Sequence, residues 1–163
     1  MAGVPVEVEG IVPVRGAVVT RIVTVPGVGA GAHASGDVVG EPFPIPDLVR
    51  VAGGGGVIET VVLIESTTNS VGTELWLFDD TISSAADDAA HSISDLDATR
   101  AVGVIPITSY TASALNSEGT ARGVGLAFNC KAGSRRLVGL LVTRGAPTYA
   151  AGGITLKVSV ILE

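Results

Sequence analysis

The sequence predicts an all-β fold, an antiparallel sandwich or barrel of about eight short strands. Apolar and polar residues alternate with a period of two along most of the chain, which is typical of half-buried strands. The 22 glycines and 8 prolines separate these segments at short intervals, as turns do. No strand–helix–strand unit is recognisable, so a doubly wound α/β fold is not expected.

Extended structure is expected from the N-terminal region onward. The segments VPVEVEGIVPV (4–14) and AVVTRIVTV (17–25) are predicted as strands or extended segments. Residues 26–50 have no clear periodicity and many glycines and prolines. Within them PFPIP (42–46) is expected to be stiff, because each proline fixes its own φ and restrains the residue before it. Such a segment suits a long crossing between two sheets, or an arm laid on a neighbouring molecule.

Four consecutive glycines, Gly53 to Gly56, open the central part of the chain. A phosphate-binding P-loop would need a lysine, a serine or threonine and then a helix, whereas these glycines lead into the β-branched run VIETVVLIE (57–65). We therefore interpret them as a permissive joint before a strand. ELWLFD (74–79) is the next predicted strand, and the polar turn STTNSVGT between the two predicts a hairpin.

Helical signal is confined to one segment. SSAADDAAHSISDLD (83–97) is predicted as the only helix or helical turn. AVGVIPIT (101–108) is again a predicted strand, and Pro106 indicates that it lies at a sheet edge or contains a bulge.

Three strands are expected in the C-terminal part. TARGVGLAFNC (120–130) has one face of larger apolar residues and one of small residues, which would permit close approach of another sheet or subunit. RRLVGLLVTR (135–144) is apolar on both faces in its middle, as a central sandwich strand would be. GITLKVSVILE (153–163) alternates regularly and is predicted as a half-buried strand.

Composition indicates a folded chain that buries much of its surface. The length of 163 residues corresponds to about one domain. Hydrophobic residues make up 47% and charged residues 16%, with a mean hydropathy of +0.54, which argues against disorder. No window of about 18 residues is apolar and free of charge, so no membrane-spanning helix is predicted. The start MAGVPVEVEG lacks the basic residues of a signal peptide.

Charge is distributed unevenly along the chain. The net charge of −6 argues against a nucleic-acid partner, which would need a basic patch. Residues 51–99 hold nine acidic residues and no lysine or arginine, whereas residues 100–163 hold seven basic residues and two acidic ones. Two interpretations stay open: charge pairing between neighbouring strands within the fold, or complementary faces between subunits.

Candidate chemical sites are few, and each has a plainer structural interpretation. PGVGAGA (26–32) matches G-x-G-x-x-A, but the sequence after it cannot form the helix that dinucleotide binding needs. Cys130 has no second cysteine to pair with and is expected to be a core or interface thiol. His33 and His91 have no neighbouring ligand at metal-site spacing. With no G-x-S-x-G motif either, we predict that the protein is not an enzyme and uses no cofactor.

Six aspartates lie between residues 79 and 97. Carboxylate oxygens are ligands that calcium prefers, which makes Asp87 and Asp88 weak candidates for a calcium site. No EF-hand loop or RTX repeat organises these aspartates, so solvated side chains that cap turns are the expected outcome.

The central segment resembles a known family. The order GGGGVIETVVLIEST (53–67), ELWLFD (74–79) and DDAAHSISDLDATRAVGVIPIT (87–108) is similar to that of small structural proteins encoded near the head genes of tailed phages. The resemblance covers about residues 36–163 and departs from the family at 81–97, where the family tends to have a loop bearing proline and asparagine. It implies a jelly-roll-like β-sandwich that cements or decorates a capsid shell, without an active site.

Together these inferences give the expected organisation and function. Residues 1–16 are predicted as an N-terminal arm or edge strand, and residues 17–163 as a single β-sandwich domain. The expected function is that of a virion structural protein, made in the bacterial host cytoplasm, that binds the capsid exterior. Its expected partners are the major capsid protein and further copies of itself, with a trimer as the first choice, but neither nucleic acid nor membrane. The predicted contacts are Val4, Val6, Val8, Ile11, Val14, Pro42, Phe43, Pro44 and Pro46.

One alternative function is kept from a different class. A carbohydrate- or cell-surface-binding module of a phage tail or adhesin would also be an all-β domain. It would be expected to show a concave site with exposed aromatic residues and calcium at the aspartates.

Overall fold

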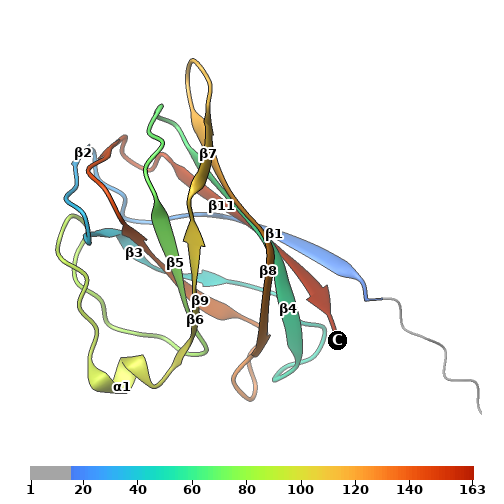
Figure 1. Ribbon diagram of the computed structural model, residues 1–163. Helices are drawn as coiled ribbons and strands as arrows, with labels where there is room; N and C mark the ends of the chain where they lie inside the picture. The colour runs from blue at the N-terminus through green and yellow to red at the C-terminus, as the bar shows by residue number, and fades with distance from the viewer. Residues whose placement is uncertain (1–15) are drawn as a thin grey trace, which may run out of the picture.

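Two antiparallel sheets face each other in residues 16–163, the part of the chain that the computed structural model describes (Figure 1). One sheet has five strands in the order β1-β11-β4-β8-β7, and the other has four in the order β3-β9-β5-β6. A short two-stranded sheet pairs β10 with β2. The predicted all-β sandwich is therefore confirmed. Within these residues no helix has the length and apolar content that a membrane span requires.

The elements are short and follow one another closely. The strands of the five-stranded sheet are β1 (Val18–Thr24), β4 (Gly55–Glu65), β7 (Ser109–Ala112), β8 (Ser117–Asn129) and β11 (Ile154–Leu162). Those of the four-stranded sheet are β3 (Val38–Ile45), β5 (Thr73–Phe78), β6 (Ala101–Ile107) and β9 (Leu137–Thr143). The remaining elements are β2 (Gly31–Ala32), β10 (Thr148–Tyr149) and the helical turn α1 (Asp95–Ala98).

The core lies between the sheets and is built by the alternation seen in the sequence. In β11 every second residue from Ile154 to Val160 is buried, and the residues between them are partly exposed. Side chains of both sheets meet in one apolar cluster that includes Leu63 and Leu75. Successive side chains of a strand point to opposite faces, so the period of two fixes which residues enter this cluster.

β9 is buried along its whole length, as predicted for a central strand. Its inner face joins the main core, whereas Val138 and Leu140 on its outer face join a second apolar cluster with Phe78. The segment 79–100, which connects β5 to β6 and is yellow-green in Figure 1, packs Ile82 and Ile93 against this second cluster. One face of the four-stranded sheet is therefore covered by the chain itself.

Two local predictions were wrong. Strands β4 and β5 do not form a hairpin: β4 pairs with β11 and β8, and β5 pairs with β9 and β6. The connection 66–72 crosses between the sheets instead. Only the end of segment 83–97 is helical, as α1, where Ser94 accepts a hydrogen bond from the backbone N–H of Asp97. The earlier part is irregular: it turns at Asp87 and Asp88, the latter with a φ of 59°, and packs Ile93 onto the four-stranded sheet.

The segment 26–50, predicted to be aperiodic, contains strand β3. It pairs with β9 with a register shift between Val39 and Phe43, which accommodates the irregular sequence. The four glycines form the predicted joint, and two of them already belong to β4. A Cβ on Gly55 would lie 2.6 Å from Asn129 Oδ1, and one on Gly56 would lie 2.8 Å from Val160 Cγ1. The close approach of β8 and β11 therefore requires glycine at these two positions.

Candidate functional site

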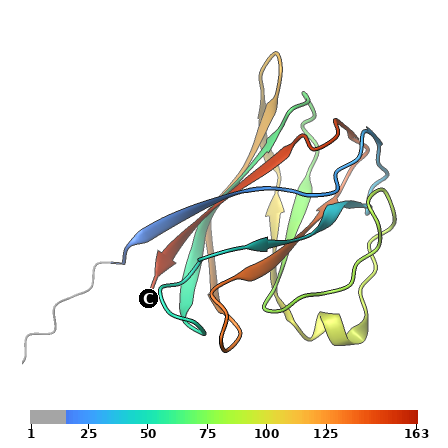
Figure 2. The same cartoon turned by 180° about the vertical axis from the view of Figure 1, so that it is seen from behind.

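The edge strands β1 and β3 lie side by side at one lateral edge of the sandwich (Figure 2). They are tied together by Arg21 of β1, whose Nε and Nη2 donate to the carbonyl oxygen of Asp47 at 3.0 and 2.8 Å. Asp47 directly follows Pro46, so the proline-rich segment 42–46 stands beside β1. The sequence predicted contacts in residues 42–46 but not in β1, and it did not predict that the two segments share an edge.

The predicted contact residues have different outcomes. Val4, Val6, Val8, Ile11 and Val14 lie outside the described residues. Pro44 and Pro46 are exposed and Pro42 is half-buried, so a partner can reach all three. Phe43 is 1% exposed, because β3 turns its side chain into the core, where the ring lies over Gly139 of the neighbouring strand. Its assignment as a surface contact is corrected: Phe43 is a core residue.

The outward side of β1 exposes two large apolar side chains and carries no charge. Val18 and Ile22 are 64% and 65% exposed, and they alternate with Thr20 and Thr24. Ile161 of the paired strand β11 continues this surface beside Val18. Exposed edge strands usually carry an outward charge or a proline that discourages pairing. The single charge of β1, Arg21, is instead engaged with Asp47.

β1 also has a free hydrogen-bonding edge. It pairs with β11 over all seven residues, and no other strand within residues 16–163 pairs with it. We call this strand and its exposed residues Val18, Thr20, Ile22 and Thr24 the β1 surface. The sequence contains a sign of this surface. In the alternation of residues 17–25, one set of alternate positions (18, 20, 22 and 24) holds only threonines and apolar residues. Period alone does not say whether a strand ends up at an edge.

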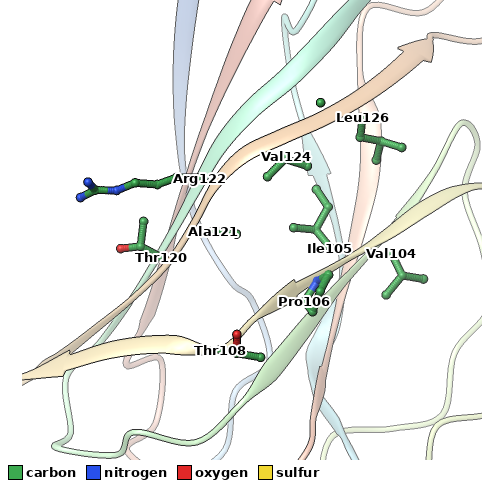
Figure 3. A pocket seen from close by; sticks show the side chains of 10 residues that line it. Val104, Ile105, Pro106, Thr108, Thr120, Ala121, Arg122, Val124 and Leu126 are labelled. Atoms are coloured by element: carbon green, nitrogen blue, oxygen red, sulfur yellow. The ribbon is translucent and has the colours of Figure 1, made fainter.

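A groove of about 530 Å³ opens at the opposite edge, between β6 and β8 (Figure 3). β7 pairs only with residues 117–120 of β8, so the rest of this edge of β8 has no strand partner within residues 16–163 and faces the groove. Val104, Ile105, Val124 and Leu126 give it an apolar lining, and Arg122 is its single titratable residue. Among its lining residues there is no aromatic ring of the kind that a sugar-binding site would be expected to present.

Asp87 and Asp88, the weak calcium candidates, differ in their surroundings. Asp87 accepts hydrogen bonds from the backbone N–H of Gly29 at 2.9 Å and of Gly40 at 2.6 Å, and it lies 3.1 Å from His33 Nε2. Partial burial acts to raise the pKa of Asp87, but these hydrogen bonds outweigh it and leave the pKa below its usual value. The side chain of Asp88 is 55% exposed.

These contacts give Asp87 a structural role. Both of its oxygens face N–H donors, which is the opposite of what a cation site would present. Within residues 16–163 no three His, Cys, Asp or Glu side chains gather in a way that could hold a metal ion. Asp87 instead ties segment 79–100 to the turn before β2 and to β3.

Replacing Asp87 with asparagine is expected to lower the free energy of unfolding by about 2 kcal/mol, because hydrogen bonds to a charged acceptor are lost. The folded-state pKa of Asp87 is depressed, so its contribution is present above the ordinary value of 3.8 and disappears as pH falls through the folded value. Urea unfolding at pH 7 and at pH 3 measures both effects. Asp88→Asn, at the adjacent exposed position, should change stability by less than about 0.5 kcal/mol.

The other candidate residues are packed into the structure. Cys130 is buried, and burial raises the pKa of its thiol. His33 is buried and its ring lies edge-on to Tyr149, with the ring centroids 5.0 Å apart. Burial lowers the pKa of His91, whose ring lies 4.6 Å from that of Trp76.

Ion pairs join the acidic and basic parts of the chain within the fold. Glu74 pairs with Arg144 at 2.6 Å and Asp97 pairs with Arg100 at 2.8 Å. Asp80 pairs with Lys131. Part of the uneven charge distribution is therefore neutralised by ion pairs within one molecule.

Comparison with known proteins adds no assignment: no protein-family model matches the chain, and no curated protein matches it in sequence.

Proposed function

We propose that this protein is a virion structural protein that binds and stabilises the outside of the capsid shell of a tailed bacteriophage. Its partners in this proposal are the major capsid protein and further copies of itself, a trimer being the first choice. The observation that carries the proposal is the β1 surface. It combines an unpaired strand edge with an exposed apolar face, and it directly follows residues 1–16, the proposed arm.

Strand addition explains how such a surface would hold a neighbour. An extended segment of the partner that pairs with β1 would gain main-chain hydrogen bonds along the free edge. Val18 and Ile22 would supply apolar burial on one face of the new strand, and Pro44 and Pro46 stand at the same edge of the molecule. Such contacts would require a rigid body and no catalytic centre.

We also propose that the sandwich is a jelly roll, and the strand order supports this. When the short strands β2, β7 and β10 are set aside, four strands remain in each sheet, in the orders β1-β11-β4-β8 and β3-β9-β5-β6. The chain passes repeatedly from one sheet to the other, and sequence neighbours such as β3 and β4 lie in different sheets. An eight-stranded double sheet of this kind is the architecture that jelly-roll proteins share.

Co-sedimentation with phage heads that lack this protein tests the proposal. Val18→Lys/Ile22→Lys is expected to weaken binding by roughly tenfold or more, because two apolar anchors would be replaced by charges in a desolvated contact. Deletion of residues 1–14 is expected to abolish binding. Both variants should keep a Tm within about 2 °C of the wild type, since the altered residues are exposed or precede the described fold.

Leu115→Lys is the matched control. Leu115 is also an exposed apolar residue, but it lies at the turn between β7 and β8, away from β1. Its replacement should leave binding unchanged. Full binding by the β1 variant and by the deletion would refute the proposal, and a specific signal on a glycan array would favour the carbohydrate-binding alternative.

A further inference from the structure

A buried acidic side chain lies at the end of the sandwich where β4 finishes. Glu65, the last residue of β4, has no exposed surface, and neither of its carboxyl oxygens has a hydrogen-bond partner. In the five-stranded sheet it stands between Ile154 of β11 and Ser117 of β8. The Ser117 hydroxyl is buried and unpartnered as well.

Further polar groups complete this cluster from the other strands. Tyr110 of β7 donates from its hydroxyl to Thr73 Oγ1 of β5 at 3.1 Å, which links the two sheets. Thr143 of β9 is paired with Thr73 and is also buried. Tyr149 of β10 is buried, and its hydroxyl has no partner.

No positive charge balances Glu65. The titratable groups that face it are the phenols of Tyr110 and Tyr149, both of which are neutral at pH 7. Behind Tyr149 lie His33 and Asp87, which contact each other. Within residues 16–163 no lysine, arginine or histidine forms an ion pair with Glu65, and Arg144, which follows β9, is paired with Glu74.

The side chain that could best solvate a carboxylate here is already occupied. Asn69, in the connection between β4 and β5, donates both of its amide hydrogens elsewhere, to Thr67 Oγ1 and to the carbonyl oxygen of Thr148, each at 2.8 Å. A charged carboxylate in this place would lack a counter-ion, and only the side chains of Asn69 and Ser117 lie near enough to hydrogen-bond to it, so ionisation is costly in this apolar interior. The neutral carboxylic acid avoids most of that cost.

We propose that Glu65 is a proton-operated latch, which keeps this end of the sandwich closed when it is protonated and opens it to water when it ionises. The segments that would move are 66–72 and 144–153, which are linked to each other beside Glu65 through Asn69 and Thr148 and through Ser66 and Gly153. The inference does not depend on the proposed partner, since it concerns the isolated molecule.

The direction of the pH effect follows from linkage. Burial raises the pKa of Glu65 from 4.5 to about 7, and the nearby Asn69 and Ser117 offset only part of the rise. Between these pH values the closed form holds a proton that an open form has released, so the closed form loses stability as pH rises through this window. The equilibrium constant for opening should increase by up to about tenfold per pH unit and level off above the pKa of Glu65 in the closed form.

Hydrogen exchange of the whole protein between pH 5 and 8, corrected for intrinsic exchange rates, tests the latch. In the wild type, protection at the end of β4 and the starts of β5 and β8 should fall by up to about tenfold per pH unit towards pH 7. In Glu65→Gln, which keeps a neutral side chain of the same shape, protection there should not change with pH. Glu59→Gln, on the same strand but partly exposed, should behave as the wild type does.

A second measurement uses only the wild type and tests the proposal even if Glu65→Gln fails to fold. An NMR titration of the Glu65 side-chain carboxyl carbon in the wild type is expected to give a midpoint near pH 7. A midpoint near the ordinary value of 4.5 would overturn the proposal. Equal pH dependence of exchange in the wild type and in a folded Glu65→Gln variant would overturn it too.

Discussion

Phe43→Ala is expected to lower the free energy of unfolding by about 3 to 5 kcal/mol, because a fully buried aromatic side chain leaves a cavity in the core. The ring lies between the two sheets, and a Cβ placed on Gly139 would come within 2.8 Å of two of its carbon atoms. The size of the ring and the absence of a side chain at Gly139 therefore complement each other. Urea unfolding followed by Trp76 fluorescence measures the loss.

Pro44→Ala is the matched control, one residue further along the same strand. Pro44 is exposed, so its replacement should change the free energy of unfolding by less than about 0.5 kcal/mol. The pair separates the two roles given to the segment 42–46, packing by Phe43 and surface contact by its prolines. Unchanged stability in Phe43→Ala, together with weaker partner binding, would restore the sequence-based assignment of Phe43 as a contact residue.

Gly40→Ala is expected to destabilise the protein by about 2 to 5 kcal/mol, from backbone strain and steric overlap together. Gly40 has a φ of 77°, and a Cβ there would lie 2.4 Å from the carbonyl oxygen of Pro26. This oxygen already accepts a hydrogen bond from Glu41, so the backbone has little room to move. Thermal unfolding monitored by circular dichroism measures the effect.

Gly133→Ala separates these two causes. Gly133 has a similar φ of 81°, but no atom lies within 4 Å of the position that its Cβ would take. This variant should carry only the strain of the left-handed conformation, about 1 to 2 kcal/mol. Equal losses in the two variants would show that the contact with Pro26 costs nothing.

Most strands could be predicted from the sequence because burial of one face imposes a period of two. The regular alternation of residues 153–163 and the continuous apolar run of 135–144 correspond to β11 and β9. Pro106 correctly indicated an edge, since β6 ends the four-stranded sheet. Each of these predictions uses only the residues of the strand itself and does not require knowledge of its neighbouring strands.

Strand pairing could not be predicted in the same way. The segments 57–65 and 74–79 have the composition of a hairpin, yet they belong to opposite sheets. Alternation says which side chains are buried, and it says nothing about which strand lies alongside. The segment 83–97 shows a related limit, because Ile93 packs on Val38, Val138 and Leu140, which are distant in the sequence.

The β1 surface and the Glu65 cluster could not be predicted either, because both depend on which strands lie side by side. The free edge of β1 follows from its position at the end of a sheet, which is a property of the whole fold. The cluster around Glu65 needs six strands to come together, and the glutamate looks like any polar strand end in the sequence. By contrast, the burial of Cys130 was predictable, because it continues the larger apolar face of its strand.

The covering of one sheet by segment 79–100 makes the two broad sides of the molecule unlike each other. Part of the four-stranded side is covered by its own chain, where Ile82 and Ile93 pack on the strands. A neighbour that approached this side would therefore contact segment 79–100 as well as the sheet. The two broad sides thus present different surfaces, strands on one and an irregular connection on the other, so a partner can distinguish one side of the molecule from the other.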